Sequence, residues 1–229
     1  MLINHAAPAG RRRASRRQDE RSAATRRKLV EAALDCVNTR GYAHASASAI
    51  ARMAGVSRGA LAHHFRNRTE LFTEVMLQVG LRMELKTRGV VDADRPVAER
   101  ISRYIDETWA VFRGDAFRAA VQIWPGTPDQ PGLHRAVVAR MERYERMRER
   151  QWHRMFEPYG VTMAEARAAR NIAIGTLRGL AFRTLFWRQS LQPRAEIALL
   201  KRLLIGLCTR PAPDRRARRR RPAPRPGAQ

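Results

Sequence analysis

The sequence predicts an all-α protein of about nine helices. Apolar residues recur at helical spacing through most of residues 22–209. Helix start and stop signals divide that stretch, and it contains no persuasive strand pattern. Both ends are instead polar, aperiodic and rich in Arg, Pro and Ala. We therefore expect a helical body between two disordered tails, residues 1–21 and 210–229.

The first helix is expected over residues 22–40. Leu29, Ala33 and Val37 form an i, i+4, i+8 stripe that one face of a helix can bury. Ser22 is a plausible N-cap, and a glycine directly after Arg40 provides a stop signal.

Three further helices follow closely. Short helices are expected over 47–54 and 57–65, with Gly55 breaking the chain between them. Asn67 and Glu70 form a capping box, in which the Asn67 side-chain oxygen accepts from the backbone N–H three residues on. A fourth helix should therefore begin at Asn67.

Five later helices, most of them longer, are predicted from proline and glycine positions and from a capping box at Thr162 and Glu165. Turn residues near 85–95 mark a domain boundary, which separates a domain 22–85 from a domain 90–209. The five expected helices cover residues 96–112, 115–124, 131–157, 162–190 and 193–209.

The charge of the chain favours a polyanionic partner. Lys and Arg number 45 against 21 Asp and Glu, a formal net charge of +24. Residues 1–28 hold nine basic and two acidic residues, and residues 209–229 hold eight and one, so each end carries +7. GC-rich coding could explain why Arg outnumbers Lys, but not why the excess lies at the ends. Nucleic acid is therefore the first partner to test.

Several functional classes are not supported. Cys36 and Cys208 lie too far apart in sequence to indicate a disulfide scaffold or a metal site. We find no nucleophile–His–acid set, paired carboxylates, phosphate loop or metal cluster, so we expect neither an enzyme nor a bound cofactor. No secretory signal or membrane-spanning run is evident. We expect a soluble cytoplasmic protein.

The strongest pattern is a helix-turn-helix over residues 46–65. Ile50 on its first helix and Leu61 and Phe65 on its second are apolar, and Gly55 suits a left-handed turn between them. That packing leaves small and basic residues facing outward, including an arginine that can bind guanine O6 and N7 together. The outward residues are Ser57, Arg58, Gly59, Ala62 and His63.

Over residues 23–75 the chain resembles the DNA-binding domain of the tetracycline-repressor (TetR) family of bacterial regulators. The residues that carry the resemblance are Arg40-Gly41-Tyr42, Ile50-Ala51, the run from Ala54 to Leu61, His63-His64-Phe65 and Asn67-Arg68.

The resemblance implies a homodimer that places the helix at 57–65 in the major groove of a palindromic operator. Ala62 departs from the family, which favours Tyr there as a phosphate contact, and Ala49 stands where an acidic residue is common. We therefore expect the basic arm before Ser22 to compensate. The implied DNA-binding residues are Ser46, Ser48, Ser57, Arg58, Gly59, Ala60, His63, His64 and Arg68.

The resemblance also implies a C-terminal domain with a cavity for an unidentified small-molecule effector and a dimer interface on the last two helices. Aromatic side chains recur there at helical spacing; core packing explains them, and an apolar ligand pocket is the second interpretation. The candidate ligand residues are Trp109, Phe112, Phe117, Trp124, Trp152 and Phe156. The candidate interface residues are Leu180, Phe182, Phe186 and Trp187.

Two functions of different kinds remain. The first is a sequence-specific, ligand-released repressor. The alternative is a largely nonspecific nucleoid-type DNA binder driven by the basic tails, in which the helix-turn-helix adds little specificity.

Overall fold

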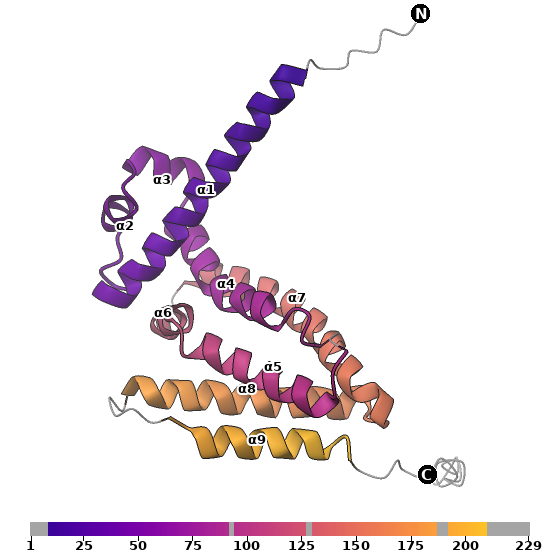
Figure 1. The fold of residues 1–229 in the computed structure, drawn as a ribbon. Helices are drawn as coiled ribbons and strands as arrows, with labels where there is room; N and C mark the ends of the chain where they lie inside the picture. The colour runs from indigo at the N-terminus through magenta and orange to yellow at the C-terminus, as the bar shows by residue number, and fades with distance from the viewer. Residues whose placement is uncertain (1–8, 92–93, 127–129, 187–191, 210–229) are drawn as a thin grey trace, which may run out of the picture. The chain divides into compact units, whose positions relative to one another are not determined.

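The computed structural model describes residues 9–91, 94–126, 130–186 and 192–209 (Figure 1). Within these ranges the fold is all-α, as the sequence predicts, with nine α-helices and two short 3-10 helices. The α-helices are α1 (Ala9–Arg40), α2 (Ala47–Ala54), α3 (Arg58–His64), α4 (Arg68–Thr87), α5 (Val97–Phe112), α6 (Asp115–Ile123), α7 (Pro131–Phe156), α8 (Met163–Phe186) and α9 (Arg194–Gly206).

The start of α1 differs from our expectation of a disordered arm over 1–21. The helix runs without interruption from Ala9 to Arg40, so Ser22 lies inside it and is not an N-cap. After Gly10 the segment holds no further glycine or proline before Gly41, and Arg, Ala, Gln and Glu have high helix propensity. Residues 17–24 are exposed, as their polarity predicts, but polarity does not prevent a helix that continues from a packed one.

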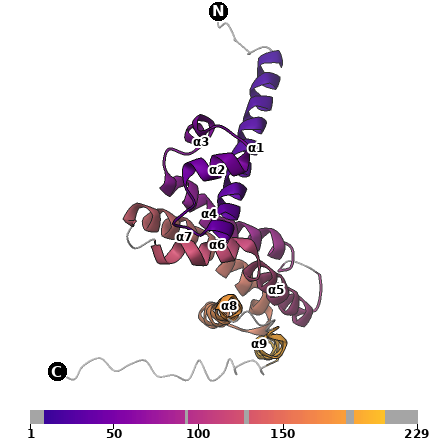
Figure 2. The same ribbon diagram turned by 90° about the vertical axis from the view of Figure 1, so that its left-hand side faces the viewer.

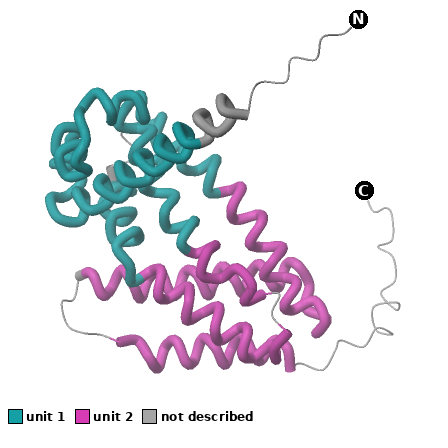
Figure 3. Tube along the Cα trace, turned by 45° about the horizontal axis from the view of Figure 1, so that its top comes forward, with its two compact units in different colours: residues 1–82, 113–141 teal, residues 83–112, 142–229 magenta. Residues whose placement is uncertain are grey.

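The described chain divides into two compact units (Figure 3). The first unit comprises residues 1–82 and 113–141, and the second comprises 83–112 and 142–229. The division therefore places α6 and the first part of α7 with the N-terminal helices, whereas the sequence led us to expect one boundary near 85–95. Local turn signals indicate where a chain bends, but they do not show which later helix returns to pack on an earlier one.

The first unit is built around the buried stripe of α1. Leu29, Ala33 and Val37 are fully buried, as predicted, and pack in one cluster with residues of α2, α3, α4, α6 and α7. Figures 1 and 2 show α2 and α3 beside α1. Because the two short helices bury only a few residues each, their positions depend on this shared core.

The second unit packs α5 against α8 and α9. Figure 2 shows α8 and α9 side by side, almost end on. Trp152 of α7 is fully buried and donates from Nε1 to the Ala166 carbonyl of α8 at 3.0 Å. Its ring lies 4.7 Å from that of Tyr104 on α5, so one aromatic side chain links three helices.

Both predicted helix starts are capped, and at Thr162 both bonds of the capping box form. The Asn67 side chain accepts from the Glu70 N–H at 2.9 Å. At the start of α8, Thr162 accepts from the Glu165 N–H at 3.2 Å, and the Glu165 carboxylate accepts from the Thr162 N–H at 2.9 Å. None of the helices in the described ranges is both long and apolar enough to cross a bilayer.

Candidate nucleic-acid interface

A left-handed glycine makes the turn between α2 and α3. Gly55 has φ 63° and ψ 39°, a conformation that a side chain would strain. Its N–H reaches the Arg52 carbonyl at 3.1 Å, and the Val56 N–H reaches the Ala51 carbonyl at 3.0 Å. These bonds close the C-terminus of α2 and start the chain toward α3.

The N-terminus of α3 is the most open part of the motif. The Ser57 hydroxyl accepts from the Ala60 N–H at 3.0 Å, which makes Ser57 the N-cap. Ser57, Arg58 and Gly59 are exposed and Ala60 is half-buried. A Cβ at Gly59 would meet only the Ser57 hydroxyl, at 3.7 Å. The backbone here can therefore approach another molecule closely, and the positive end of the helix dipole suits a phosphate.

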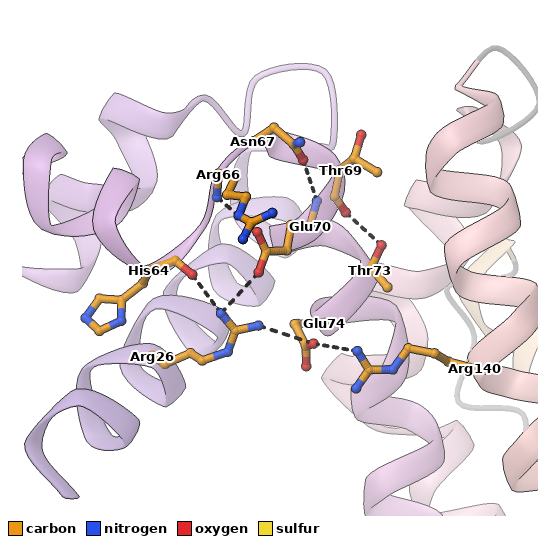
Figure 4. Close-up of polar contacts among 9 residues, drawn as sticks. All are labelled: Arg26, His64, Arg66, Asn67, Thr69, Glu70, Thr73, Glu74 and Arg140. Atoms are coloured by element: carbon orange, nitrogen blue, oxygen red, sulfur yellow. Dashed lines mark hydrogen bonds and ion pairs between the residues drawn. The ribbon is translucent and has the colours of Figure 1, made fainter. Parts of the chain in front are cut away.

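A polar network holds the C-terminus of α3 (Figure 4). Arg26 of α1 donates from Nη1 to the His64 carbonyl at 2.7 Å, and its guanidinium lies over the Phe65 ring at 4.2 Å. The same guanidinium pairs with Glu70 at 3.5 Å and with Glu74 at 3.3 Å, both on α4. One side chain thus ties α1, α3 and α4 together at the end of the motif.

The network extends to α4 and α7. The Glu70 carboxylate also accepts from the backbone N–H of Arg66, just before the start of α4, at 3.0 Å. Glu74 also pairs with Arg140 of α7 at 3.1 Å (Figure 4). The sequence could not reveal these contacts, because they join residues up to 66 positions apart.

Arg68 donates hydrogen bonds to two backbone carbonyls of its own unit, which the resemblance did not indicate. Its Nη1 donates to the Ala45 carbonyl at 2.8 Å and its Nη2 to the Tyr42 carbonyl at 2.6 Å. Its guanidinium lies 4.6 Å from the ring centroids of both Tyr42 and Phe72. Arg68 is still exposed and has further N–H groups, so its contact with phosphate remains a prediction.

The two serines expected near DNA at the start of α2 differ in their hydrogen bonding within the chain. Ser46 is the N-cap, and its hydroxyl accepts from the Ala49 N–H at 3.2 Å. It can still donate its proton outward, since a hydroxyl both donates and accepts. Ser48 is exposed, and its contact with DNA remains a prediction.

The adjacent histidines face different surroundings. His63 is exposed and His64 half-buried, with ring centroids 5.3 Å apart. Burial, followed by the charges of His63 and Arg26, lowers the pKa of His64 below its ordinary value. The lowered pKa favours the neutral ring of His64, which is a weaker phosphate ligand than a charged imidazole.

A hollow of about 380 Å³ lies next to Ala62. In the family Tyr is usual at this position, so the small residue leaves room at the surface of the motif. Three arginines line the hollow and make its rim strongly positive: Arg58, Arg66 and Arg68. The arrangement can attract phosphate without a tyrosine hydroxyl.

The six aromatic residues proposed for a ligand pocket do not belong to one unit. Phe117 and Trp124 lie in the first unit, where Trp124 is exposed and contacts His134 at 5.6 Å between ring centroids. The remaining four lie in the second unit, with Trp109 half-buried and Phe112, Trp152 and Phe156 at most 2% exposed. Core packing accounts for Trp152, because its indole N–H is satisfied within the unit.

The residues proposed for the dimer interface differ in their exposure. Leu180 is 8% exposed and packs inside its own unit, whereas Phe182 is 46% exposed. The side chain of Phe186, and the whole of Trp187, lie outside the described residues. The structure adds exposed apolar residues that the sequence analysis missed: Ile172 of α8 and Leu199 and Leu203 of α9.

Comparisons with known proteins agree with this geometry. Residues 29–75 match the family model described as bacterial regulatory proteins, tetR family. The HTH-type transcriptional regulator CymR of Pseudomonas putida is 27% identical over 171 residues, which cover 75% of this chain and 84% of CymR. The HTH-type transcriptional regulator BetI of Pseudomonas fluorescens is 32% identical over 118 residues, 48% of this chain and 58% of BetI.

Solved structures show the same fold. The fatty acid degradation regulator FadR from Bacillus halodurans has a TM-score of 0.66 at 18% identity, covering 80% of this chain and 95% of FadR. A transcriptional regulator from Pseudomonas aeruginosa has a TM-score of 0.63 at 22% identity, covering 83% and 91%. The capped recognition helix, the left-handed turn and the matched family model lead to one conclusion. The chain belongs to the TetR family of bacterial regulators, and is a DNA-binding transcriptional regulator rather than an enzyme.

Proposed function

We propose that the protein is a repressor that binds a palindromic operator as a homodimer in the bacterial cytoplasm and leaves it when an effector binds. The observation that carries this proposal is the exposed N-terminus of α3, with Ser57, Arg58 and Gly59 accessible on a motif that Arg26 holds in place. Arg58 can read guanine through two hydrogen bonds, and the small neighbours let the backbone come close to DNA.

The exposed apolar residues of α8 and α9 support the dimer. Ile172 is 65% exposed, Phe182 46%, Leu199 49% and Leu203 64%. Gly175 and Gly179 lie on α8 with nothing within 4 Å of an added Cβ. A second protomer that packs here would cover apolar area and approach the glycines closely, and a two-fold axis would match a palindromic site.

The course of α7 supports control by an effector. Its first part belongs to the first unit, where Arg140 pairs with Glu74. Its second part belongs to the second unit. A ligand that shifts α7 would therefore act on the Glu74 carboxylate that also holds Arg26, and so on α3.

The decisive experiment is selection of binding sites from random duplex DNA with the purified full chain. We expect an enriched palindrome, and a specific complex that survives excess nonspecific DNA at physiological salt. If no sequence is enriched, or if specific and nonspecific affinities are equal, the proposal is wrong.

The charge of the termini favours a second candidate, a nonspecific DNA binder. Residues 1–28 alone carry a net charge of +7. If the arm contributes only nonspecific affinity to a specific protein, deleting residues 1–21 should flatten the slope of log affinity against log salt by about 2–5 across the dimer. Sequence preference should not change. If the deletion abolishes all DNA binding, the nonspecific function is favoured.

A further inference from the structure

The hollow of about 380 Å³ next to Ala62 has an apolar floor and a basic rim, all within the first unit. The floor residues are at most 7% exposed: Ala45, Ile50, Leu61, Phe65, Leu71 and Phe72. The rim residues are exposed: Ser46, Ala47, Arg58, Ala62, Arg66, Asn67 and Arg68. Two of these rim residues, Ser46 and Arg58, are among those expected at DNA. The hollow therefore opens on the side of the motif that we expect to meet the duplex.

The rim carries positive charge without a balancing carboxylate. Arg58, Arg66 and Arg68 line the hollow, and none of the described residues that line it is Asp or Glu. Glu70 lies close by, but its carboxylate already pairs with Arg26 at 3.5 Å and accepts from the Arg66 N–H. An anion in the hollow would therefore meet three guanidinium groups and no lining carboxylate.

Arg66 is the rim arginine to which the sequence analysis gave no function. Its backbone N–H donates to the Glu70 carboxylate at 3.0 Å, and the Phe65 N–H before it donates to the Leu61 carbonyl at 2.9 Å (Figure 4). The Asn67 side chain caps α4 directly after it. The Arg66 side chain is instead exposed, and with the residues that the structure describes it makes no hydrogen bond or ion pair. Its backbone is thus fixed while its guanidinium is available to a ligand.

The two residues after Arg66 present further donors at the same opening. Arg68 is held at the rim by its bonds to the Tyr42 and Ala45 carbonyls. The Oδ1 of Asn67 accepts from the Glu70 N–H, which leaves the Nδ2 amide to donate elsewhere. A group with several acceptor oxygens and a negative charge matches this set of donors.

The size and the floor of the hollow indicate more than a bare ion. At about 30 Å³ for each water, its volume corresponds to roughly a dozen water molecules. A sugar attached to a phosphate uses such a space better than phosphate alone, because its carbon atoms can cover the apolar floor. The chain belongs to a DNA-binding family, and the DNA backbone presents this combination at every nucleotide.

We propose that the hollow seats one deoxyribose-phosphate unit of the DNA backbone. Arg66 donates to the phosphate, and the small side chain of Ala62 leaves the space for the sugar. The contact carries no base information, but it fixes the position of α3 along the groove. It goes beyond the proposed function, since it requires DNA binding but neither repression nor an effector.

The first test measures binding of the full chain to a duplex of arbitrary sequence between about 50 and 200 mM salt. Arg66→Gln should lower affinity and flatten the slope of log affinity against log salt by about 0.9 for each protomer bound. Arg52→Gln removes the same charge from an exposed position of α2 outside the hollow, and should flatten the slope by less. Equal slopes in the two variants would make Arg66 an ordinary surface charge and overturn the proposal.

The second test fills the hollow without changing the charge. Ala62→Leu should lower affinity for the same duplex by about tenfold or more, because the added side chain occupies the space of the sugar. Ala139→Leu, at an exposed position of α7 in the same unit, is the matched control and should bind as the unaltered chain does. Unchanged affinity in Ala62→Leu would mean that the hollow stays empty on DNA. If that variant does not fold, judged by circular dichroism, Arg66→Gln decides.

The third test locates the phosphate on an operator selected from random DNA. Methylphosphonate replaces one phosphate at a time, which removes its charge. The unaltered chain should lose about fivefold in affinity at one position per half-site, whereas Arg66→Gln should lose less than about twofold there. Losses that multiply independently at every position would contradict the pairing of Arg66 with a phosphate.

Failure of this contact differs from failure of the proposed function. If no operator is selected, the repressor is lost, but the salt slopes and Ala62→Leu still decide the contact on the arbitrary duplex. If an operator is selected and Arg66→Gln behaves as Arg52→Gln does, the repressor stands and the contact is lost. Calorimetric binding of free deoxyribose 5-phosphate at micromolar concentration would assign the hollow to a small molecule instead of DNA, and would also overturn the proposal.

Discussion

In the first unit Arg26 and Arg68 donate to backbone carbonyls of that unit, and Arg26 also pairs with two carboxylates. In the second unit Arg148 and Arg170 are almost fully buried and share the single carboxylate of Glu145. The first arrangement fixes the recognition helix before DNA arrives. The second holds two buried positive charges beside one carboxylate.

The difference shows how one residue type serves two purposes. A satisfied arginine network costs little and gives a rigid site, whose remaining exposed groups can meet phosphate. Two buried arginines that share one carboxylate depend on that carboxylate, so its removal should destabilise the fold strongly. Mutations that exchange or remove these partners test the contrast.

The largest effect is expected from Glu145→Gln. The change removes the carboxylate that Arg148 and Arg170 share, and these side chains are only 6% and 2% exposed. The free energy of unfolding should fall by about 3 kcal/mol. Urea unfolding followed by tryptophan fluorescence measures it. Glu142→Gln, whose partner Arg146 is 62% exposed, is the control and should cost less than about 0.5 kcal/mol. Equal losses of unfolding free energy in the two variants would mean that Glu145, Arg148 and Arg170 are as well solvated as the exposed pair.

The next effect concerns Arg26→Met in the first unit. The variant loses the bond to the His64 carbonyl and both pairs with α4, so we expect a loss of about 2 kcal/mol in unfolding free energy. Operator affinity should fall as well, because α3 loses its attachment to α1. Arg27→Met removes the same charge at an exposed neighbouring position, so it should leave the unfolding free energy unchanged and lower operator affinity by less than Arg26→Met does. If Arg26→Met lowers stability but leaves affinity intact, the network does not position α3.

Substitutions of Arg58 and Arg68 compare an exposed arginine at the start of α3 with an arginine that is hydrogen-bonded to two backbone carbonyls. Arg58→Ala should cost about 1–3 kcal/mol of specific affinity and relax preference at one base pair per half-site, with stability unchanged. Arg68→Ala should reduce stability, since its two bonds to Tyr42 and Ala45 are lost, and should weaken all sequences about equally. Anisotropy on a set of single-base operator variants measures both. If Arg58→Ala changes no base preference, Arg58 contacts phosphate.

Smaller effects are expected at two open glycines. Gly59→Ala and Gly179→Ala place a methyl group where the protomer leaves room, so each should stabilise its helix by about 0.5–1 kcal/mol. Gly59→Ala should weaken DNA binding, and Gly179→Ala should weaken self-association in sedimentation. If Gly179→Ala leaves self-association unchanged, that face of α8 is not the interface.

The smallest effect is the pH dependence due to His64. Because its pKa is lowered in the folded state, the unfolded chain binds the proton first as the pH falls. Stability is therefore complete above the ordinary histidine pKa of 6.5 and declines on acidification through the lowered value. His64→Gln should flatten the change in unfolding free energy between about pH 5 and 7. An unchanged slope would assign the dependence to other groups.

The sequence by itself determined the helices and the DNA-binding motif. Leu29, Ala33 and Val37, the glycine at position 55 and the capping boxes at Asn67 and Thr162 are local signals. Local signals act through propensity, hydrogen bonds within a few residues and the period of the helix. They predicted the recognition helix to within a residue or two of α3. They failed at the start of α1, where low hydrophobicity was taken for disorder although helix propensity is high.

Only the tertiary structure decided what each arginine does. Composition treats the Arg residues as one positive total, whereas the fold places Arg26 against the end of α3, turns Arg68 onto two carbonyls and buries Arg170 beside Glu145. The same holds for Leu180 and Ile172, which share a helix but differ in exposure from 8% to 65%. Side-chain partners and burial depend on contacts between residues far apart in sequence. No local pattern records those contacts, because the free energy that selects them comes from packing the whole unit.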